Sequence, residues 1–236
     1  MNKLQNYFYK SIVTAAVMLV GVSSAWSQVS LGSASAFSVL GGTNVTCTSG
    51  VIAGDVGVAP GGAVPYTNTG CTVGGSVPPA TNAAAVRART DFLNAYTSIQ
   101  YLPCDDTLLS TIAGPITLAP GVYCTAASLT GTEVLLTLDA KNDANATWVF
   151  KINGAFTGTN YHVVMKNGGQ PCNVYWVPTA AATLTTSSLM GNILAGDTVG
   201  GSITMTGGTL VGNAFSNVAA TITGGNVIGC KALSNP

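Results

Sequence analysis

Alternating polar and apolar positions recur in short segments along the chain, and each segment contains glycine or another small residue. Residues 204–213 read TMTGGTLVGN, and residues 221–230 read TITGGNVIGC. Successive side chains of a strand point to opposite faces, and glycine allows the backbone to turn a corner at positive φ. Each segment is therefore predicted to be a strand, a corner and the beginning of the next strand. Segments 46–55, 67–76 and 183–192 align with these two without a gap, and segments 128–137 and 155–164 align more loosely.

The spacing of these segments predicts a solenoid. Within the two blocks that they form, their first residues lie 21, 27, 28, 21 and 17 residues apart. An inexact period of about 20–28 residues is typical of a solenoid in which each repeat forms one coil. We therefore expect a mainly β domain with about six coils.

The same alternation predicts which side chains face the core. Met205 faces one way, and Thr204 and Thr206 face the other. Adjacent coils are about 4.8 Å apart, and residues i and i+2 of a strand are about 6.7 Å apart, so the outward threonines are expected to form a flat grid. The position of Met205 is apolar or cysteine in the other coils, which makes its side the core: Cys47, Phe156, Leu184 and Ile222.

The threonine grid has a structural and a functional explanation. Threonine has a high β propensity, and threonine rows can form the hydrated surface of any solenoid. The predicted face, however, contains almost no Lys, Arg, Asp or Glu, and only 7% of the chain is charged, against about 25% in typical domains. A flat surface that avoids charge favours binding to a regular target.

Residues 80–101 are predicted to form one long α-helix between two proline-containing segments. Thr81 or Asn82 is expected to cap its beginning. A helix of about 20 residues is roughly 30 Å long, so it can lie along the solenoid and span about six coils. One stripe of the helix is apolar and is expected to be buried there: Ala85, Ala88, Phe92, Ala95, Ile99 and Leu102.

The first 27 residues are predicted to be a secretory signal peptide. Lys3 and Lys10 precede an apolar segment, 12–25, that is too short for a comfortable membrane span, and cleavage could follow Ala25 or Ser27. Residues 28–236 would then form a single secreted domain. This domain carries six basic and eight acidic residues, a net charge of −2. Its electrostatic field therefore does not attract nucleic acid or an acidic membrane.

Six cysteines in an exported chain indicate disulfide bonds, although six cysteines allow fifteen pairings. No two of them lie two to four residues apart, and the chain has one histidine, so a zinc site is not favoured. We expect no metal or cofactor. Proximity along the predicted helix and coils favours Cys104–Cys124 and Cys47–Cys71, and it leaves Cys172–Cys230 as the third pair. The Cys104–Cys124 bond would hold a small cap at about 103–124 in place.

The chain resembles the large microbial ice-binding protein family. The resemblance covers nearly all of the mature chain, from about Leu31 to Cys230, and it is the order and spacing of the matching stretches that make it specific. Besides the alanine-rich helix, these stretches are LGSASAFSVLGGTNVT (31–46), GDVGVAPG (54–61), ITLAPGVY (116–123), LTLDAKNDANATWVFKI (136–152) and CNVYW (172–176).

The resemblance implies a right-handed β-solenoid with three faces, one of which is covered by the helix. It also implies a discontinuous solenoid, in which the N-terminal coil stacks against the last C-terminal coil. One flat face binds ice, in some members through Thr-Ala/Gly-x-Thr/Asn motifs. Four such motifs begin at Thr69, Thr157, Thr206 and Thr223, whereas coil 183–192 departs from the pattern and coil 128–137 ends its motif in Glu133.

Ice is therefore the expected partner, contacted by a protein that we expect to be a monomer. Coil 128–137 is not counted among the contributors. The expected ice-contacting residues are Thr48, Thr69, Thr72, Thr157, Thr159, Asn160, Thr183, Thr185, Thr204, Thr206, Thr209, Thr221, Thr223 and Asn226.

Two other classes of function remain as alternatives. A β-helical enzyme that cleaves polysaccharides needs clustered carboxylates or bound calcium, but the acidic residues are scattered and His162 has no evident partner. We therefore expect a surface histidine and no enzyme. A secreted adhesin or polysaccharide-binding module would need exposed aromatic residues, but Trp148 and Trp176 lie in apolar strands and Trp26 lies at the cleavage site.

Overall fold

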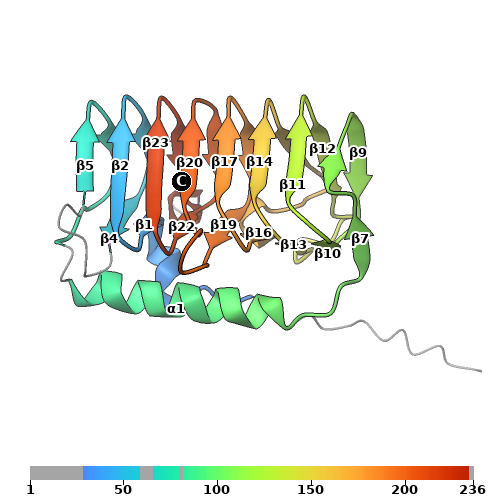
Figure 1. The fold of residues 1–236 in the computed structure, drawn as a ribbon, viewed down its shortest axis with the longest axis horizontal. Coiled ribbons are helices and arrows are strands. Elements are labelled where there is room, and N and C mark those ends of the chain that lie inside the picture. Colours follow the sequence, from blue (N-terminus) through green and yellow to red (C-terminus); the bar gives the residue numbers. More distant parts are fainter. Residues whose placement is uncertain (1–28, 59–65, 80–81, 234–236) are drawn as a thin grey trace, which may run out of the picture.

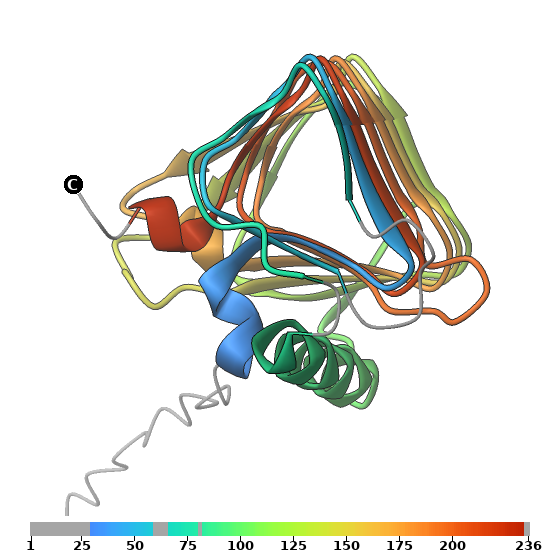
Figure 2. The same cartoon turned by 90° about the vertical axis from the view of Figure 1, so that its left-hand side faces the viewer.

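A computed structural model describes residues 29–58, 66–79 and 82–233. The predicted signal peptide, Trp26 and Thr81 lie outside these residues. Three parallel sheets form the sides of a solenoid that is triangular in cross-section (Figures 1 and 2). Each sheet has eight strands, so the solenoid has eight coils, more than the six or so expected.

Sheet A, in spatial order, consists of β4 (Asp55–Val58), β1 (Phe37–Gly41), β22 (Ala214–Ser216), β19 (Asn192–Ala195), β16 (Val174–Pro178), β13 (Trp148–Ile152), β10 (Gly121–Thr125) and β7 (Asp106–Leu108). Sheet B consists of β5 (Tyr66–Thr69), β2 (Asn44–Thr48), β23 (Ala219–Thr223), β20 (Ile203–Thr206), β17 (Ala182–Thr185), β14 (Phe156–Thr159), β11 (Leu129–Thr132) and β8 (Thr111–Ile112). Sheet C consists of β6 (Thr72–Val73), β3 (Val51–Ile52), β24 (Asn226–Ile228), β21 (Thr209–Val211), β18 (Ser188–Met190), β15 (His162–Lys166), β12 (Leu135–Asp139) and β9 (Pro115–Leu118).

The solenoid is discontinuous in sequence, as the family resemblance implies. The first coil, β1–β3, lies between the second coil, β4–β6, and the last coil, β22–β24. Its strands pair in register with the last coil, for example Val39 with Ala214 and Val45 with Ala220. The N-terminal and C-terminal parts of the chain therefore form one continuous set of sheets (Figure 1).

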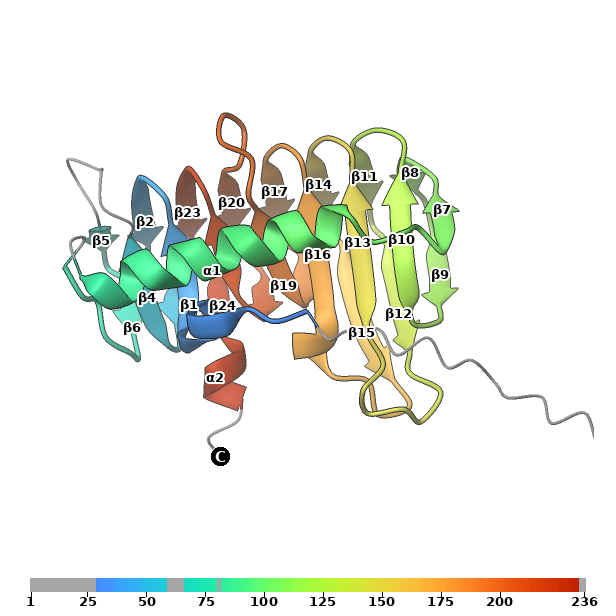
Figure 3. The ribbon, with the colours of Figure 1, turned by 90° about the horizontal axis from the view of Figure 1, so that it is seen from below.

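Helix α1 (Ala83–Gln100) runs along the outside of sheet A (Figure 3). The side chain of Asn82 caps it by accepting a 2.7 Å hydrogen bond from the Ala84 N–H. Leu102 lies beyond the end of the helix and is half-buried against the apolar side chains between α1 and sheet A. The rest of the predicted stripe is buried: Ala85, Ala88, Phe92, Ala95 and Ile99.

Sheet A is consequently covered on both faces. Its outward side chains pack against α1, and they come from six coils: Leu40, Val122, Val149, Tyr175, Val177, Leu194 and Phe215. Three short helices complete the fold, η1 (Gly32–Ala36), η2 (Pro171–Asn173) and α2 (Cys230–Leu233). A strand that is buried on both faces has no polar alternation, which explains why β1 and β16 are buried along their whole length.

Three disulfides join the pairs expected from the sequence: Cys47–Cys71, Cys104–Cys124 and Cys172–Cys230. The second bond lies at the end of the solenoid where α1 finishes. The segment at 103–124, expected as a small cap, contains the end coil β7–β9 and most of β10.

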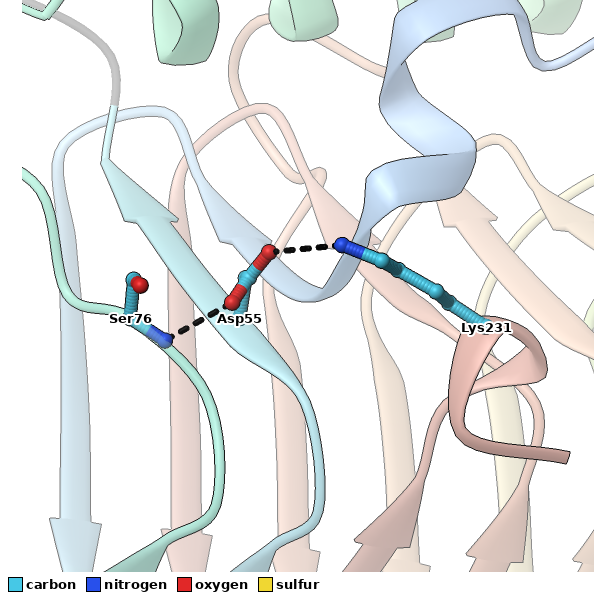
Figure 4. Close-up of polar contacts among 3 residues, drawn as sticks. All are labelled: Asp55, Ser76 and Lys231. Carbon is cyan, nitrogen blue, oxygen red and sulfur yellow. Dashed lines mark hydrogen bonds and ion pairs between the residues drawn. The ribbon is translucent and has the colours of Figure 1, made fainter. Parts of the chain in front are cut away.

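An ion pair also connects the two parts of the chain. Lys231 of α2 lies 3.3 Å from the carboxylate of Asp55 in β4 (Figure 4). The other carboxylate oxygen of Asp55 accepts a 2.7 Å hydrogen bond from the Ser76 N–H. The C-terminal helix is thus tied to the second coil. In the described part of the chain, no helix is long and apolar enough to cross a membrane.

The docking of α1 gives the first testable prediction. Phe92 is fully buried, with its ring centroid 5.7 Å from that of Phe215 in β22. Phe92→Ala would leave a cavity at this contact, so the free energy of unfolding should fall by about 3–5 kcal/mol in a denaturant titration. Val86→Ala, at an exposed position of the same helix, is the control and should change it by less than about 0.5 kcal/mol. Equal effects of the two substitutions would show that this contact contributes little.

Candidate functional site

Two columns of threonine run along the outer face of sheet B. In the first threonine column, all eight strands carry threonine at the same register position. From β5 to β8 these residues are Thr67, Thr46, Thr221, Thr204, Thr183, Thr157, Thr130 and Thr111. At one end, the hydroxyls of Thr111 and Thr130 are within hydrogen-bonding distance of each other, 3.2 Å.

The second threonine column lies two residues further along the strands. It has seven members, because β8 ends at Ile112: Thr69, Thr48, Thr223, Thr206, Thr185, Thr159 and Thr132. All members of both columns are exposed or half-exposed. The strands from β5 to β11 stand side by side in Figure 1.

The surroundings of the columns are small and uncharged. None of the eight strands of sheet B contains Lys, Arg, Asp or Glu. In six coils, the residue two positions before the first column is also small or an amide: Asn44, Ser128, Ala155, Ala181, Ser202 and Ala219. The face is therefore without long side chains between its edges.

The core beneath this face is rigid and aromatic. Phe156 stacks on Trp176 at 4.9 Å, and Tyr161 meets both rings edge-on. Gly131 and Gly158 provide the room for Tyr161, because a Cβ at Gly131 would lie 2.7 Å from the Tyr161 ring. Trp148 and Trp176 are fully buried, as predicted.

At the corner between sheets B and C, one residue of every coil has the left-handed backbone conformation, with a positive φ. Six of the corner N–H groups donate, over 2.7–3.0 Å, to the carbonyl of the second-column threonine in the neighbouring coil. The inter-coil hydrogen bonding therefore continues through the corner and fixes the edge of the face. The corner residues have φ between 47° and 80°: Ser49, Gly70, Gly114, Glu133, Asn160, Thr186, Gly207 and Gly224.

The structure divides the predicted ice-contacting residues into two groups. Thr72, Thr209 and Asn226 lie around the corner, on sheet C, and Asn160 is a corner residue. The other ten lie in the two columns: Thr48, Thr69, Thr157, Thr159, Thr183, Thr185, Thr204, Thr206, Thr221 and Thr223.

The sequence alignment was wrong by two residues in two coils. Thr157 pairs with Thr183, not with Thr185, so the corner equivalent to Thr206–Thr209 is Thr159–His162. Phe156 faces the core but pairs with Ala182, and Gly158 occupies the row of Leu184 and Met205. The physical reason is that Asn160 and Glu133 make the left-handed turn that glycine makes in four other coils, so aligning glycine with glycine shifted these coils.

Five column members were missed: Thr46, Thr67, Thr111, Thr130 and Thr132. Glu133 does not remove its coil from the columns, because it is the corner residue that follows Thr132. Thr46 and Thr67 already align with Thr204 in the repeat but were not counted as contacts, whereas aligning Thr-x-Thr pairs with one another would have found Thr130 and Thr132. Thr111 stands alone in β8, and no repeat in the sequence indicates it.

The perturbed carboxylates belong to local turns and not to the columns. The N–H groups of Gly200 and Val199 lower the pKa of Asp197, and those of Lys141 and the Asn167 side chain lower the pKa of Asp139. His162 is an exposed residue of sheet C, as expected. Among the described residues, no three His, Cys, Asp or Glu side chains gather as a metal site would require.

Comparison with known proteins gives consistent results. The family model for ice-binding-like proteins matches residues 39–228. An ice-binding protein of Nostoc sp. (strain HG1) is 39% identical over 173 residues, which are 70% of this chain and 61% of the relative. Ice-binding protein 1 of Shewanella frigidimarina (strain NCIMB 400) is 30% identical over 219 residues, 79% of this chain and 24% of the relative. The chain therefore spans less than two thirds of both relatives.

Solved structures match over most of the chain. The crystal structure of an ice binding protein from an Antarctic Biological Consortium has 32% identity and a TM-score of 0.74, and the match covers 85% of this chain and 90% of that one. The match therefore includes the greater part of the solenoid that forms the threonine columns.

Tyr161, beneath the columns, gives a prediction about their support. Its hydroxyl is buried and has no hydrogen-bond partner among the described residues, and burial raises its pKa. Tyr161→Phe should therefore raise the free energy of unfolding by about 1 kcal/mol and leave the face unchanged. Tyr175→Phe is the matched control, because the Tyr175 hydroxyl donates to the Val29 carbonyl at 3.2 Å, and it should lose about 1 kcal/mol. Denaturant unfolding measures both; a loss in Tyr161→Phe would mean that the hydroxyl is satisfied.

Proposed function

The chain belongs to the ice-binding-like family, and we propose that it adsorbs to ice through the outer face of sheet B and so inhibits ice growth and recrystallisation. The observation that carries this proposal is the pair of in-register threonine columns, one with a member in every coil. Ice offers neither charge nor a pocket, only a lattice of water oxygens. A regular array on a flat plane is the shape of surface that can match a lattice.

Threonine suits such a surface. Its hydroxyl can join ordered water, its methyl disfavours disordered water, and its stiff χ1 means that little entropy is lost on binding. One hydroxyl contributes only about 0.5–1.5 kcal/mol. The columns act together, because the first contacts position all the others on the same rigid plane. Eight coils about 4.8 Å apart give this plane a length of roughly 34 Å.

The absence of charge from sheet B supports the same target. A charged side chain holds its own hydration shell tightly, and this shell does not have the order of ice. Removing it would cost several kcal/mol, more than one threonine contact contributes. The small residues beside the first column also leave the lattice free to approach.

The alternative, a secreted polysaccharide-binding module, has less support. Such modules stack sugars on exposed aromatic rings, but Trp148 and Trp176 are buried. Tyr101 is 83% exposed, but it follows α1 on the side of sheet A and does not belong to the threonine face. We propose no enzymatic activity and no cofactor.

We also propose that the protein is exported and works as a monomer. Residues 1–27 would be removed as a signal peptide, and residues 28–236 would form the ice-binding domain outside the cell. Three disulfides suit an oxidising compartment. One face is sufficient for adsorption, so we propose a monomer that binds neither nucleic acid nor membranes.

The experiment uses the double variant Thr206→Tyr/Thr223→Tyr. These two residues are neighbours in the second threonine column. Their tyrosine rings would stand above the plane and hold the adjacent coils away from ice, so most thermal hysteresis and recrystallisation inhibition should be lost. The Tm should barely change, because an outward strand position tolerates an aromatic side chain within about 0.5 kcal/mol.

Two controls accompany this variant. Thr117→Tyr places the same ring at an exposed position of sheet C and should retain activity. Thr206→Ser keeps the hydroxyl but loses the methyl and the χ1 stiffness, so its effect should be milder. Full activity in the folded double variant would place the ice-binding surface elsewhere on the molecule.

A further inference from the structure

Thr186 has a backbone conformation that its side chain disfavours. Its φ is +47°, and it is the corner residue between Thr185 of sheet B and Ser188 of sheet C. A β-branched residue in the left-handed region is strained. Four other coils place glycine at this corner position, where it costs nothing: Gly70, Gly114, Gly207 and Gly224.

Packing does not explain why a threonine stands at this corner. A Cβ at Gly114 or Gly224 would meet no atom within 4 Å, and one at Gly70 or Gly207 would make only ordinary van der Waals contacts, so the corner position is not a packed one. Thr186 itself is exposed. The residue therefore adds strain without burying apolar surface, and such strain is maintained mostly at positions with a function.

The Thr186 side chain is held by a partner in the neighbouring coil. Its hydroxyl donates a hydrogen bond to the side-chain carbonyl of Asn160, which is the corner residue of that coil and also has a φ of +47°. On the other side, the Thr186 methyl lies 3.6 Å from the place where a Cβ of Gly207 would be. The hydrogen bond to Asn160 fixes χ1 of Thr186, and with it the directions of both the hydroxyl and the methyl.

The backbone beneath the pair is also fixed. The Asn160 N–H donates to the Thr185 carbonyl at 3.0 Å, and the Thr186 N–H donates to the Thr206 carbonyl at 2.8 Å. Below them, the buried hydroxyl of Ser187 accepts a hydrogen bond from the Tyr161 N–H at 3.1 Å. These bonds hold the pair at the end of the second threonine column, directly after Thr159 and Thr185.

The pair still offers hydrogen-bonding groups to water. Because the Asn160 side-chain oxygen can only accept, the Thr186 hydroxyl uses its hydrogen in this bond and keeps its lone pairs. The Asn160 amide nitrogen has two N–H groups, and neither has a hydrogen-bond partner within the described residues. The exposed Thr186 and the half-buried Asn160 therefore offer an acceptor, unused donors and a methyl at the edge of the face, next to the hydroxyls and methyls of the threonine columns.

We propose that the Thr186–Asn160 pair extends the ice-contacting surface around the corner from sheet B, a proposal that rests on the function proposed above. The extension leads towards a polar row of sheet C in which Ser188, Thr209 and Asn226 pair in register. The ligand is the ordered water of the ice lattice at the edge of the contact. The strain at Thr186 is retained because glycine would leave this edge without groups that bind it.

The test is Thr186→Gly in the mature protein. Glycine removes the strain, so the Tm should stay the same or rise, whereas thermal hysteresis should fall about twofold, the effect of losing one weak contact. A residue with only a structural role would move both quantities in the same direction. Asn160→Gly should give the same fall, and the double variant should lose no more than either single one, because the pair acts as a unit. Thr186→Ser keeps the hydroxyl and should retain most activity.

Ser49→Gly is the matched control. Ser49 is an exposed corner residue with a φ of +53°, and its side chain makes no hydrogen bond within the described residues, so hysteresis should be retained while the Tm stays the same or rises, as in Thr186→Gly. Unchanged hysteresis in Thr186→Gly, or a fall in hysteresis together with the Tm, would overturn the inference. The Thr206→Tyr/Thr223→Tyr variant separates the two proposals: if it is inactive while Thr186→Gly is fully active, only the corner inference fails.

Discussion

In-register pairing of parallel strands between coils is the interaction on which the structure depends. Each coil pairs with the next in all three sheets, and most corners continue the pairing into the following sheet. The side-chain period of a strand is two, so a slip of one residue would turn every threonine of that coil inward. The inward residues Leu184, Met205 and Ile222 prevent this slip, because they are buried in the core and could not be exposed without a large loss of burial. The core thus determines the position of each threonine on the surface.

The order of the coils adds a second requirement. The first coil joins the last one without a covalent link between their strands, so the columns are continuous only when the two ends of the chain are in place. Helix α1 packs on coils from both parts of the chain, and the Lys231–Asp55 ion pair joins α2 to the second coil, whereas each of the disulfides lies within one part. A surface pair such as Lys231–Asp55 contributes about 0–1 kcal/mol, so most of this closure comes from the buried face of α1 and the strand pairing. The surface that we propose for ice contact therefore depends on a helix on another side of the molecule.

The sequence predicts the fold better than the detail of the face. Alternation, the helical stripe and the cysteine positions are local signals, and they gave the solenoid, α1 and the disulfide pairs. The register of two coils was wrong because a left-handed corner can be made by Asn160 or Glu133 as well as by glycine, and only the tertiary structure shows which residue turns. Thr111 was missed because its short strand has no second threonine, and its place in the first column comes from pairing with Thr130. Asn82 was one of two candidates for the helix cap, and the hydrogen bond to Ala84 assigns it.

The physical demands on a lattice-binding face differ from those on a pocket. A pocket concentrates binding energy in a few residues, whereas here each threonine contributes little and the common plane provides the cooperativity. Loss of one hydroxyl therefore matters less than a side chain that protrudes from the plane. This explains why the sequence tolerates Asn44, Ser202 or Ala181 beside the columns but has no long charged residue there. It also explains the glycines under the face: Gly131 and Gly158 let Tyr161 fit beneath the strands without pushing them outward. Flatness, more than the identity of any one residue, is the property that this sequence maintains on sheet B.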